Sequence, residues 1–490
     1  MLFNSYTFIF FFLPVTFVIY FYLNKKRLTE ASKAFLVLSS LFFYSWWNIV
    51  YLPLILISIL FNYSLGREFS KHSQKKRNYS PKVLLSIGIV FNLALLGYFK
   101  YADFFIENFN FISTSEVSLL HLALPLAISF YTFQQIAYLV DSYRGETHEY
   151  DFLNYTVFVT FFPQLIAGPI VHHSEMMPQF AQLKNKVLQY HNIAAGIFIF
   201  VIGLFKKVVI ADSFAIWATQ GFDFERSLTM LEGWMTSFSY TFQLYFDFSG
   251  YTDMAIGAAL LFNIRLPINF DSPYKATDIQ DFWRRWHITL SRFLKEYIYI
   301  PLGGNRKSEI QTYSNLFITF LLGGIWHGAG WTFVVWGALH GLALVIHRAW
   351  KKLGLHMPTL LAWFITFNFI NIAWVFFRAT SFDSAIKVLH AMFSMDGDLF
   401  SKSKQFPHML HYTHPLSEYV SINMVNYMFI LLLIGFVLSL YAKNAHILRD
   451  RFMQMKQIPF FWAIAIGILF GISLIVIASN PSSEFLYFNF

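Results

Sequence analysis

Two histidines stand out because each lies where an imidazole could act on a substrate. His327 sits in the middle of an apolar, glycine-rich run, residues 322–341, which reads LGGIWHGAGWTFVVWGALHG. Buried polar side chains are costly, and at membrane depth they usually mark a working site. His287 lies about forty residues upstream, in the charged stretch DFWRRWHITLSRFLKEY, residues 281–297. Histidine titrates near neutrality and can activate a hydroxyl as a general base, so we expect the two segments to form one reactive centre.

The charged stretch predicts one amphipathic helix with a basic half and an aromatic half. The basic side chains are Arg284, Arg285, Arg292 and Lys295. Such a helix is expected near the membrane surface, where Arg and Lys could hold lipid phosphates. Alternatively, some of them bind the phosphates of a donor on the cytoplasmic side, because Arg and Lys suit phosphate oxygens. His287 falls at the boundary between the halves, where a buried structural histidine is the alternative.

Glycines surround His327 at spacings that favour close helix packing. Gly324 and Gly328 stand four residues apart, as do Gly337 and Gly341. Small residues at this spacing let helices approach closely, so His327 is expected in a confined site. An ordinary buried histidine remains the alternative. His340 is predicted to project from a different helical face and to be structural.

The composition predicts an all-α polytopic membrane protein. Of the 490 residues, 56% are hydrophobic, 20% are aromatic and only 13% are charged, against about 25% charged in soluble domains. The basic residues cluster in short connectors, the positive-inside pattern, and no basic–aromatic alternation typical of a nucleic-acid module occurs. The chain has no cysteine, which excludes disulfides, thiolate metal sites and a cysteine nucleophile.

Apolar runs along the chain predict about eleven to thirteen transmembrane or re-entrant segments. The first, Leu2 to Leu23, reads as a retained helix, and the basic residues after it place the amino terminus outside. The run Leu231 to Phe262 is too long for one straight span and contains Asp247 and Asp253, so we expect it to be broken or partly re-entrant.

We expect a single membrane-embedded domain over residues 1–490. It would comprise N-terminal helices in 1–120, a catalytic core in 121–350 and C-terminal helices in 351–490, with an interfacial or extramembrane segment near 380–420. The chain shows no internal repeat, and its unusual residues form one cluster, between Asp247 and His340. Both features count against a transporter. The histidines at 172 and 173, and those at 408, 411 and 414, lack a metal-site signature, so no metal is predicted.

In order along the chain, a set of motifs resembles the membrane-bound O-acyltransferase family, and within it the alginate O-acetyltransferase membrane subunits. The motifs are the opening MLFNSYTFIFFFLP, PLAISFYTFQQIAYLVDSYRG, FFPQLIAGPIVHHSEMMPQF, YFDFSGYTDMAIG, DFWRRWHITLSRFLKEYIYIPLGGNR, the run around His327 and the ending FLYFNF. The resemblance implies a funnel of helices around a tunnel between cytoplasm and outer side. It also implies that His327 is the principal catalytic histidine and that His287 occupies the second position, which is Asn in some branches.

The resemblance further implies transfer of acetyl from acetyl-CoA, used as substrate and not as a bound cofactor. His327 would act as general base, and His287 would orient a substrate or stabilise developing charge. The acceptor would be an SGNH-type periplasmic or extracellular partner or an exopolysaccharide hydroxyl, outside a bacterial inner membrane. Related members transfer D-alanine to teichoic acid or acetyl to peptidoglycan, and these remain alternatives. A channel or transporter for a small polar solute is the non-enzyme alternative.

Overall fold

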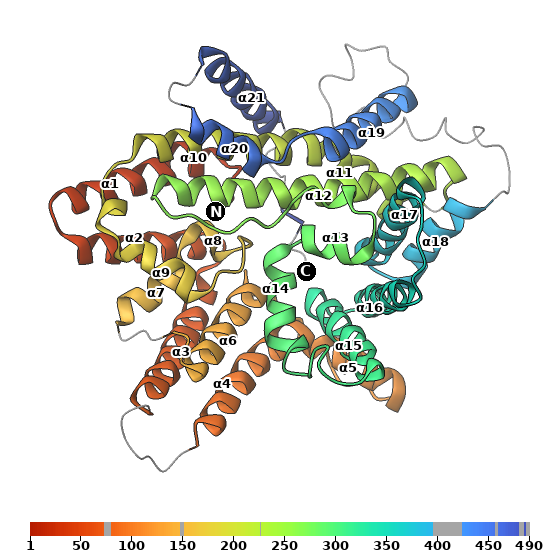
Figure 1. Ribbon diagram of the computed structural model, residues 1–490, viewed down its shortest axis with the longest axis horizontal. Helices are drawn as coiled ribbons and strands as arrows, with labels where there is room; N and C mark the ends of the chain where they lie inside the picture. Colours follow the sequence, from red (N-terminus) through yellow and green to blue (C-terminus); the bar gives the residue numbers. More distant parts are fainter. Residues whose placement is uncertain are drawn as a thin grey trace. The chain divides into compact units, whose positions relative to one another are not determined.

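The computed structural model describes residues 1–72, 80–147, 151–225, 227–394, 424–455, 459–479 and 485–486. All regular structure in these ranges is helical, and no strand occurs among them (Figure 1). The predicted all-α class is therefore confirmed. The histidines at 408, 411 and 414 lie outside the described residues, as does most of the segment near 380–420.

Two compact units divide the chain. The first consists of Met1–Phe200, Tyr251–Ile268 and Arg451–Met455. Its helices are α1 (Leu13–Lys25), α2 (Thr29–Ser45), α3 (Leu52–His72), α4 (Pro81–Leu96), α5 (Ala102–Ser113), α6 (Ile128–Arg144), α7 (Phe152–Thr160), α8 (Phe162–Leu165) and α9 (His173–Ala181). Three helices contribute residues to both units: α10 (Tyr190–Phe205), α12 (Met230–Leu261) and α20 (Ala445–Gln454).

The second unit consists of Val201–Gly250, Asn269–Asp450 and Lys456–Phe490, and it carries both histidines singled out above. Its helices are α11 (Asp212–Thr219), α13 (Ile279–Arg285), α14 (Ile288–Leu294), α15 (Glu309–His327), α16 (Trp331–Lys352), α17 (Thr359–Arg378), α18 (Phe382–Phe393), α19 (Met424–Tyr441) and α21 (Phe460–Ser479). The domain boundaries expected from the sequence stay a prediction.

Seven helical stretches within the described residues are long and apolar enough to cross a membrane. They are Thr7–Lys25, Ile49–Phe69, Pro81–Ser113, Tyr190–Phe224, Trp331–Lys352, Thr359–Arg378 and Phe460–Ser479. The bent pair Asn426–Tyr441 and Ala445–Gln454 would bring the number to eight. The expected eleven to thirteen segments also included shorter or more polar runs, and that count stays a prediction.

One expectation about helix continuity is wrong. The run predicted to be broken forms a single helix, α12, of 32 residues from Met230 to Leu261. Its interior carboxylate, Asp247, is 1% exposed and lies 2.8 Å from the ammonium group of Lys207. Because the cation compensates the buried charge, the helix does not need to open to hydrate it.

Candidate active site

His327 ends helix α15 at a tight turn into α16. The two helices form an antiparallel hairpin and lie side by side (Figure 1), with residues 328–330 between them. The glycine-rich run 322–341 is thus two helix ends and a turn. Gly324 does serve close packing, because a Cβ there would lie 2.5 Å from the carbonyl oxygen of Phe333 and 2.7 Å from Cα of Gly337. Gly328 belongs instead to the turn.

Aromatic rings enclose the His327 imidazole, which is 4% exposed. The ring centroid of Trp326 is 4.9 Å away, that of Trp336 is 5.0 Å away and that of Phe377 is 5.1 Å away. These rings come from the end of α15, from α16 and from α17. The hairpin and α17 therefore hold the imidazole in a confined, water-poor setting, where electrostatic interactions are stronger than in bulk water.

His287 lies at a break that the sequence did not predict. The stretch expected to be one helix is divided into α13 and α14, which meet at an angle (Figure 1). His287 itself adopts a left-handed backbone conformation, with φ +44° and ψ +54°. Trp286 and His287 leave the helical path there, and an interrupted helix needs other partners for its backbone groups.

The segment Asn269–Asp271 supplies those partners. The N–H of Ile288 donates to the Asn269 carbonyl at 3.0 Å, and the N–H of Asp271 donates to the Arg285 carbonyl at 2.9 Å. These bonds fix the break on both sides of His287. They also explain why a helical pattern alone missed it, because the competing partners lie upstream in an irregular segment.

The Asn269 side chain determines which nitrogen of His287 carries a proton. Its Oδ1 accepts from the N–H of Thr289 at 3.1 Å and from the Thr289 hydroxyl at 3.0 Å. The same oxygen lies 3.2 Å from Nδ1 of His287. Because Oδ1 of Asn269 can only accept hydrogen bonds, Nδ1 of His287 must be the donor in this contact. Nδ1 therefore carries the hydrogen, and Nε2 keeps its lone pair.

His287 is fully buried, not at the edge of an amphipathic helix as the sequence predicted. The Phe248 ring meets it edge-on at 4.8 Å, from helix α12. Burial lowers the pKa of His287 to about 3, because the charged form would lose its hydration. The ring is therefore neutral near pH 7, and its Nε2 can accept a hydrogen bond.

Three tryptophans connect the two histidine segments within the second unit. Trp286, next to His287, has its ring centroid 5.0 Å from that of Trp374. Trp374 in turn stacks on Trp336 at 5.7 Å, and Trp336 contacts His327. The structure thus joins the two predicted histidines through one aromatic cluster.

His340 belongs to the same aromatic cluster. Its ring lies 4.7 Å from that of Trp336, and its Nδ1 accepts a hydrogen bond from Nε1 of Trp283 at 3.2 Å. The side chain is fully buried. This hydrogen bond and packing suit the structural role predicted for it, and they link α13 to α16.

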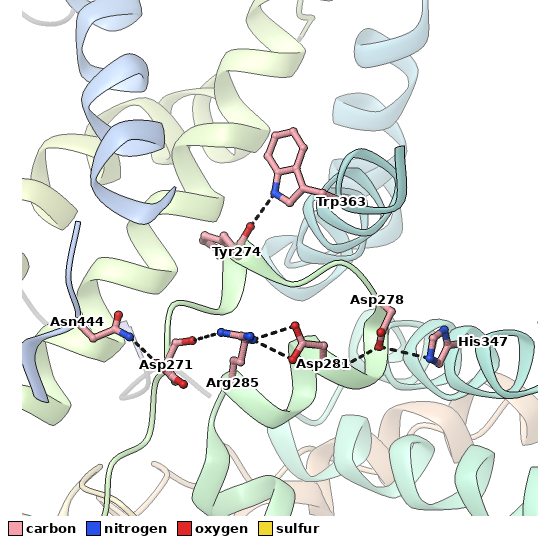
Figure 2. A network of polar contacts seen from close by, with 8 residues as sticks. All are labelled: Asp271, Tyr274, Asp278, Asp281, Arg285, His347, Trp363 and Asn444. Atoms are coloured by element: carbon pink, nitrogen blue, oxygen red, sulfur yellow. Dashed lines mark hydrogen bonds and ion pairs between the residues drawn. The ribbon is translucent and has the colours of Figure 1, made fainter. Parts of the chain in front are cut away.

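The four predicted donor-binding residues have different environments. Arg284 and Lys295 are exposed, whereas Arg285 and Arg292 are partly buried. Arg285 holds Asp281 with its Nε at 2.9 Å and 3.0 Å from the two carboxylate oxygens (Figure 2). Arg285 is thus committed to an internal ion pair, and Arg284 and Lys295 are the exposed cations of the set.

Figure 2 shows that the Arg285–Asp281 pair is part of a longer polar network. Asp278 caps α13 by accepting from the N–H of Asp281 at 2.7 Å, and its carboxylate lies 3.4 Å from Nε2 of His347 on α16. At the other end, the Asn444 amide donates to the Asp271 carboxylate at 2.6 Å. The network fastens α13 to its neighbours, so it supports the break that carries His287.

Sequence reasoning missed Asn269, which orients His287. A lone asparagine in an irregular segment has no distinguishing spacing, and it lies 18 residues upstream of its partner. Only the fold brings the two together.

Comparisons with known proteins agree with this architecture. The family model for membrane-bound O-acyltransferases matches residues 140–386, a range that includes both histidines and the segment around Asn269. A peptidoglycan O-acetyltransferase from Helicobacter pylori is 51% identical over 100% of this chain and 98% of its own length. A probable alginate O-acetylase, AlgI, from Pseudomonas aeruginosa is 43% identical over 80% of this chain and 75% of its own.

A more distant relative carries a different acyl group. A teichoic acid D-alanyltransferase from Streptococcus thermophilus is 27% identical over 51% of this chain and 68% of its own length. The extent of the two O-acetyltransferase matches, together with the match to the family model, shows the family that the motifs resembled. The chain belongs to the membrane-bound O-acyltransferase family and is a multi-pass membrane enzyme that transfers acyl groups.

Proposed function

We propose that this enzyme moves an acetyl group from cytoplasmic acetyl-CoA to a polysaccharide hydroxyl outside the membrane, with His327 as general base. The observation that carries the proposal is the placement of His327 at the α15–α16 turn, inside a cage of aromatic rings. A general base must be oriented by its surroundings and shielded from competing water. The hairpin supplies both.

The proposed reaction balances as follows. The acceptor hydroxyl loses its proton to His327 while its oxygen attacks the thioester carbonyl carbon. The tetrahedral intermediate collapses, the carbon–sulfur bond breaks, and the imidazolium returns the proton to the leaving thiolate. His287, neutral and with Nε2 as acceptor, orients a hydroxyl or thiol near this centre. The exposed Arg284 and Lys295 attract the phosphates of the donor.

For the acceptor, we favour peptidoglycan. The relative named for that polymer matches this chain over 100% of its length, whereas the alginate-type relative matches over 80%. An exopolysaccharide of the alginate type is the second candidate, because its representative is still 43% identical. D-alanyl transfer has weaker support, since that relative covers 51% of the chain.

Proposed partners and location follow from the same chemistry. Acetyl-CoA is made in the cytoplasm and its acceptor lies outside, so the enzyme would sit in the bacterial inner membrane with its amino terminus outside. An SGNH-type transferase beyond the membrane would receive the acetyl group where the polymer is not reached directly. Co-purification of such a protein with the full chain would support this arrangement.

The test compares His327→Ala with His356→Ala in cells that lack the native gene. His356 is an exposed histidine, so its replacement controls for loss of an imidazole elsewhere. Membrane levels of both variants are matched by immunoblot, and acetate esters are measured separately on peptidoglycan and on exopolysaccharide. Loss of ester only with His327→Ala supports the proposal, and the polymer that loses it identifies the acceptor. Unchanged ester on both polymers refutes it.

A further inference from the structure

A buried charged cluster in the second unit lies close to His287 but has no role in the chemistry above. Lys207 Nζ is 2.7 Å from an Asp212 oxygen and 2.8 Å from an Asp247 oxygen. The side chains of Lys207 and Asp247 are 3% and 1% exposed. Buried charges are costly unless cations and hydrogen-bond donors compensate them.

Irregular helix geometry and a glycine bring this cluster together. Lys207 lies in a π-helical segment, Lys206–Ala211, between α10 and α11. Such wide turns inside helices frequently occur at functional sites. On α12, Gly250 permits close approach, because a Cβ there would lie 2.7 Å from the Gly203 carbonyl oxygen. Asp247, one turn before Gly250, thereby reaches Lys207.

A further donor to Asp247 comes from Leu486, 239 residues later in the chain. The backbone N–H of Leu486 donates to Oδ2 of Asp247 at 3.0 Å, while Oδ1 faces Lys207. The two carboxylate oxygens therefore have different partners, a cation and a main-chain donor. A hydrogen bond from a backbone N–H to a charged acceptor is among the stronger ones in proteins.

The adjacent residue, Phe485, adds an apolar contact. Its side chain is 1% exposed, and its ring lies 5.9 Å from that of Phe248. Phe248 follows Asp247 on α12 and makes the edge contact with His287 described above. Phe248 therefore contacts both the docked segment and His287.

We propose that Asp247, held by Lys207, is a docking site for the chain's own segment Phe485–Leu486, and that the docked segment positions Phe248 against His287. Lys207 and Asp247 act as positioning residues, since they reach His287 only through other side chains. The docking half of the proposal stands on contacts alone. The positioning half rests on the proposed function, because it assumes that His287 takes part in acyl transfer.

Docking is tested by cysteine accessibility, which this chain suits because it contains no cysteine. Leu486→Cys keeps the backbone donor and introduces the sole thiol of the full chain. In detergent, maleimide is expected to label it at least about tenfold faster when Asp247→Ala is added, because loss of a charged acceptor undocks the segment. Asp212→Asn is the matched control, since Asp212 holds Lys207 but not Leu486, and it should leave the rate unchanged. Equal rates with and without Asp247→Ala overturn the docking site.

Positioning is tested with Leu486→Pro against Leu486→Ala. Proline removes the N–H that Asp247 accepts, whereas alanine keeps it and controls for loss of the side chain. We expect kcat to fall about tenfold in Leu486→Pro with KM for acetyl-CoA unchanged, and Leu486→Ala to remain within twofold of the parent. Equal kcat in the two variants, or a change confined to KM, overturns the positioning role. If His327→Ala retains activity, the proposed chemistry fails, but the labelling result still decides docking.

Discussion

Replacement of Gly324 by alanine tests whether the α15–α16 contact sets the position of His327. The added Cβ would lie 2.5 Å from the Phe333 carbonyl oxygen, and ordinary contacts begin near 3.4 Å. The obstacle is backbone, which cannot rotate away as a flexible side chain could. The helices must therefore separate by about 0.9 Å, the difference between the two distances.

The expected effect on activity is large because His327 lies one turn after Gly324. A displacement of about 1 Å at a catalytic group can cost roughly a hundredfold in rate. Alanine is favoured over glycine in a helix by about 1 kcal/mol, but overpacking costs about 1–3 kcal/mol. We therefore expect a folded enzyme of equal or lower stability with about one hundredth of the parent activity.

Gly330→Ala is the matched control, because its Cβ would meet nothing closer than 3.6 Å. Acetyl ester formation is measured with purified membranes at equal enzyme concentration, and folding is checked by size-exclusion profile in detergent. Two results would refute the reasoning: Gly324→Ala with more than a third of the parent rate, or Gly330→Ala with an equal loss.

Three other changes probe the surroundings of the site. Arg284→Glu should raise the apparent KM for acetyl-CoA several-fold, and an unchanged KM would indicate that Arg284 contacts lipid instead. Arg285→Glu should mainly lower stability, by about 1 kcal/mol or less, through loss of the Asp281 pair, whose side chains are 33% and 27% exposed. Donor saturation curves separate the two variants. Asn269→Ala removes the oxygen that accepts from three buried donors, two on Thr289 and one on His287, and should cost about 1–3 kcal/mol in unfolding free energy, read from thermal melts. The pKa of His287 is about 3 in the folded state and 6.5 for a free imidazole, so between these pH values the unfolded state binds more protons. The free energy of unfolding should therefore fall as the pH drops from 6.5 toward 3, and His287→Gln should flatten that part of the profile. A slope that the substitution leaves unchanged would contradict this prediction.

Much of the fold could be predicted because a membrane helix requires a long, continuous run of apolar residues, which is visible in the sequence. The first apolar run, expected over Leu2 to Leu23, is observed as the candidate span Thr7–Lys25. Close helix packing at glycines was also predicted, and Gly324 confirms it, whereas Gly328 lies in the turn. Both inferences need only local sequence and the geometry of a helix.

The failures occurred where distant residues decide the local conformation. The stretch 281–297 contains neither proline nor glycine, so nothing local marks the break at His287. Backbone bonds to Asn269–Asp271 stabilise the break, and these partners are brought there by the fold. Conversely, Asp247 predicted a broken α12, but Lys207 neutralises it from another helix. The sequence shows each polar residue but not its partner.

The left-handed conformation at His287 restricts what evolution can place there. Residues with φ near +44° are drawn mainly from glycine, asparagine, aspartate and histidine, because other side chains strain the backbone. Histidine and asparagine codons differ by one nucleotide, and both side chains can face the Asn269 amide. A lineage could therefore exchange one for the other in a single mutational step without rebuilding the break. The backbone conformation therefore limits this position to a few residue types, and which of them is present decides the hydrogen-bonding groups that the site contains.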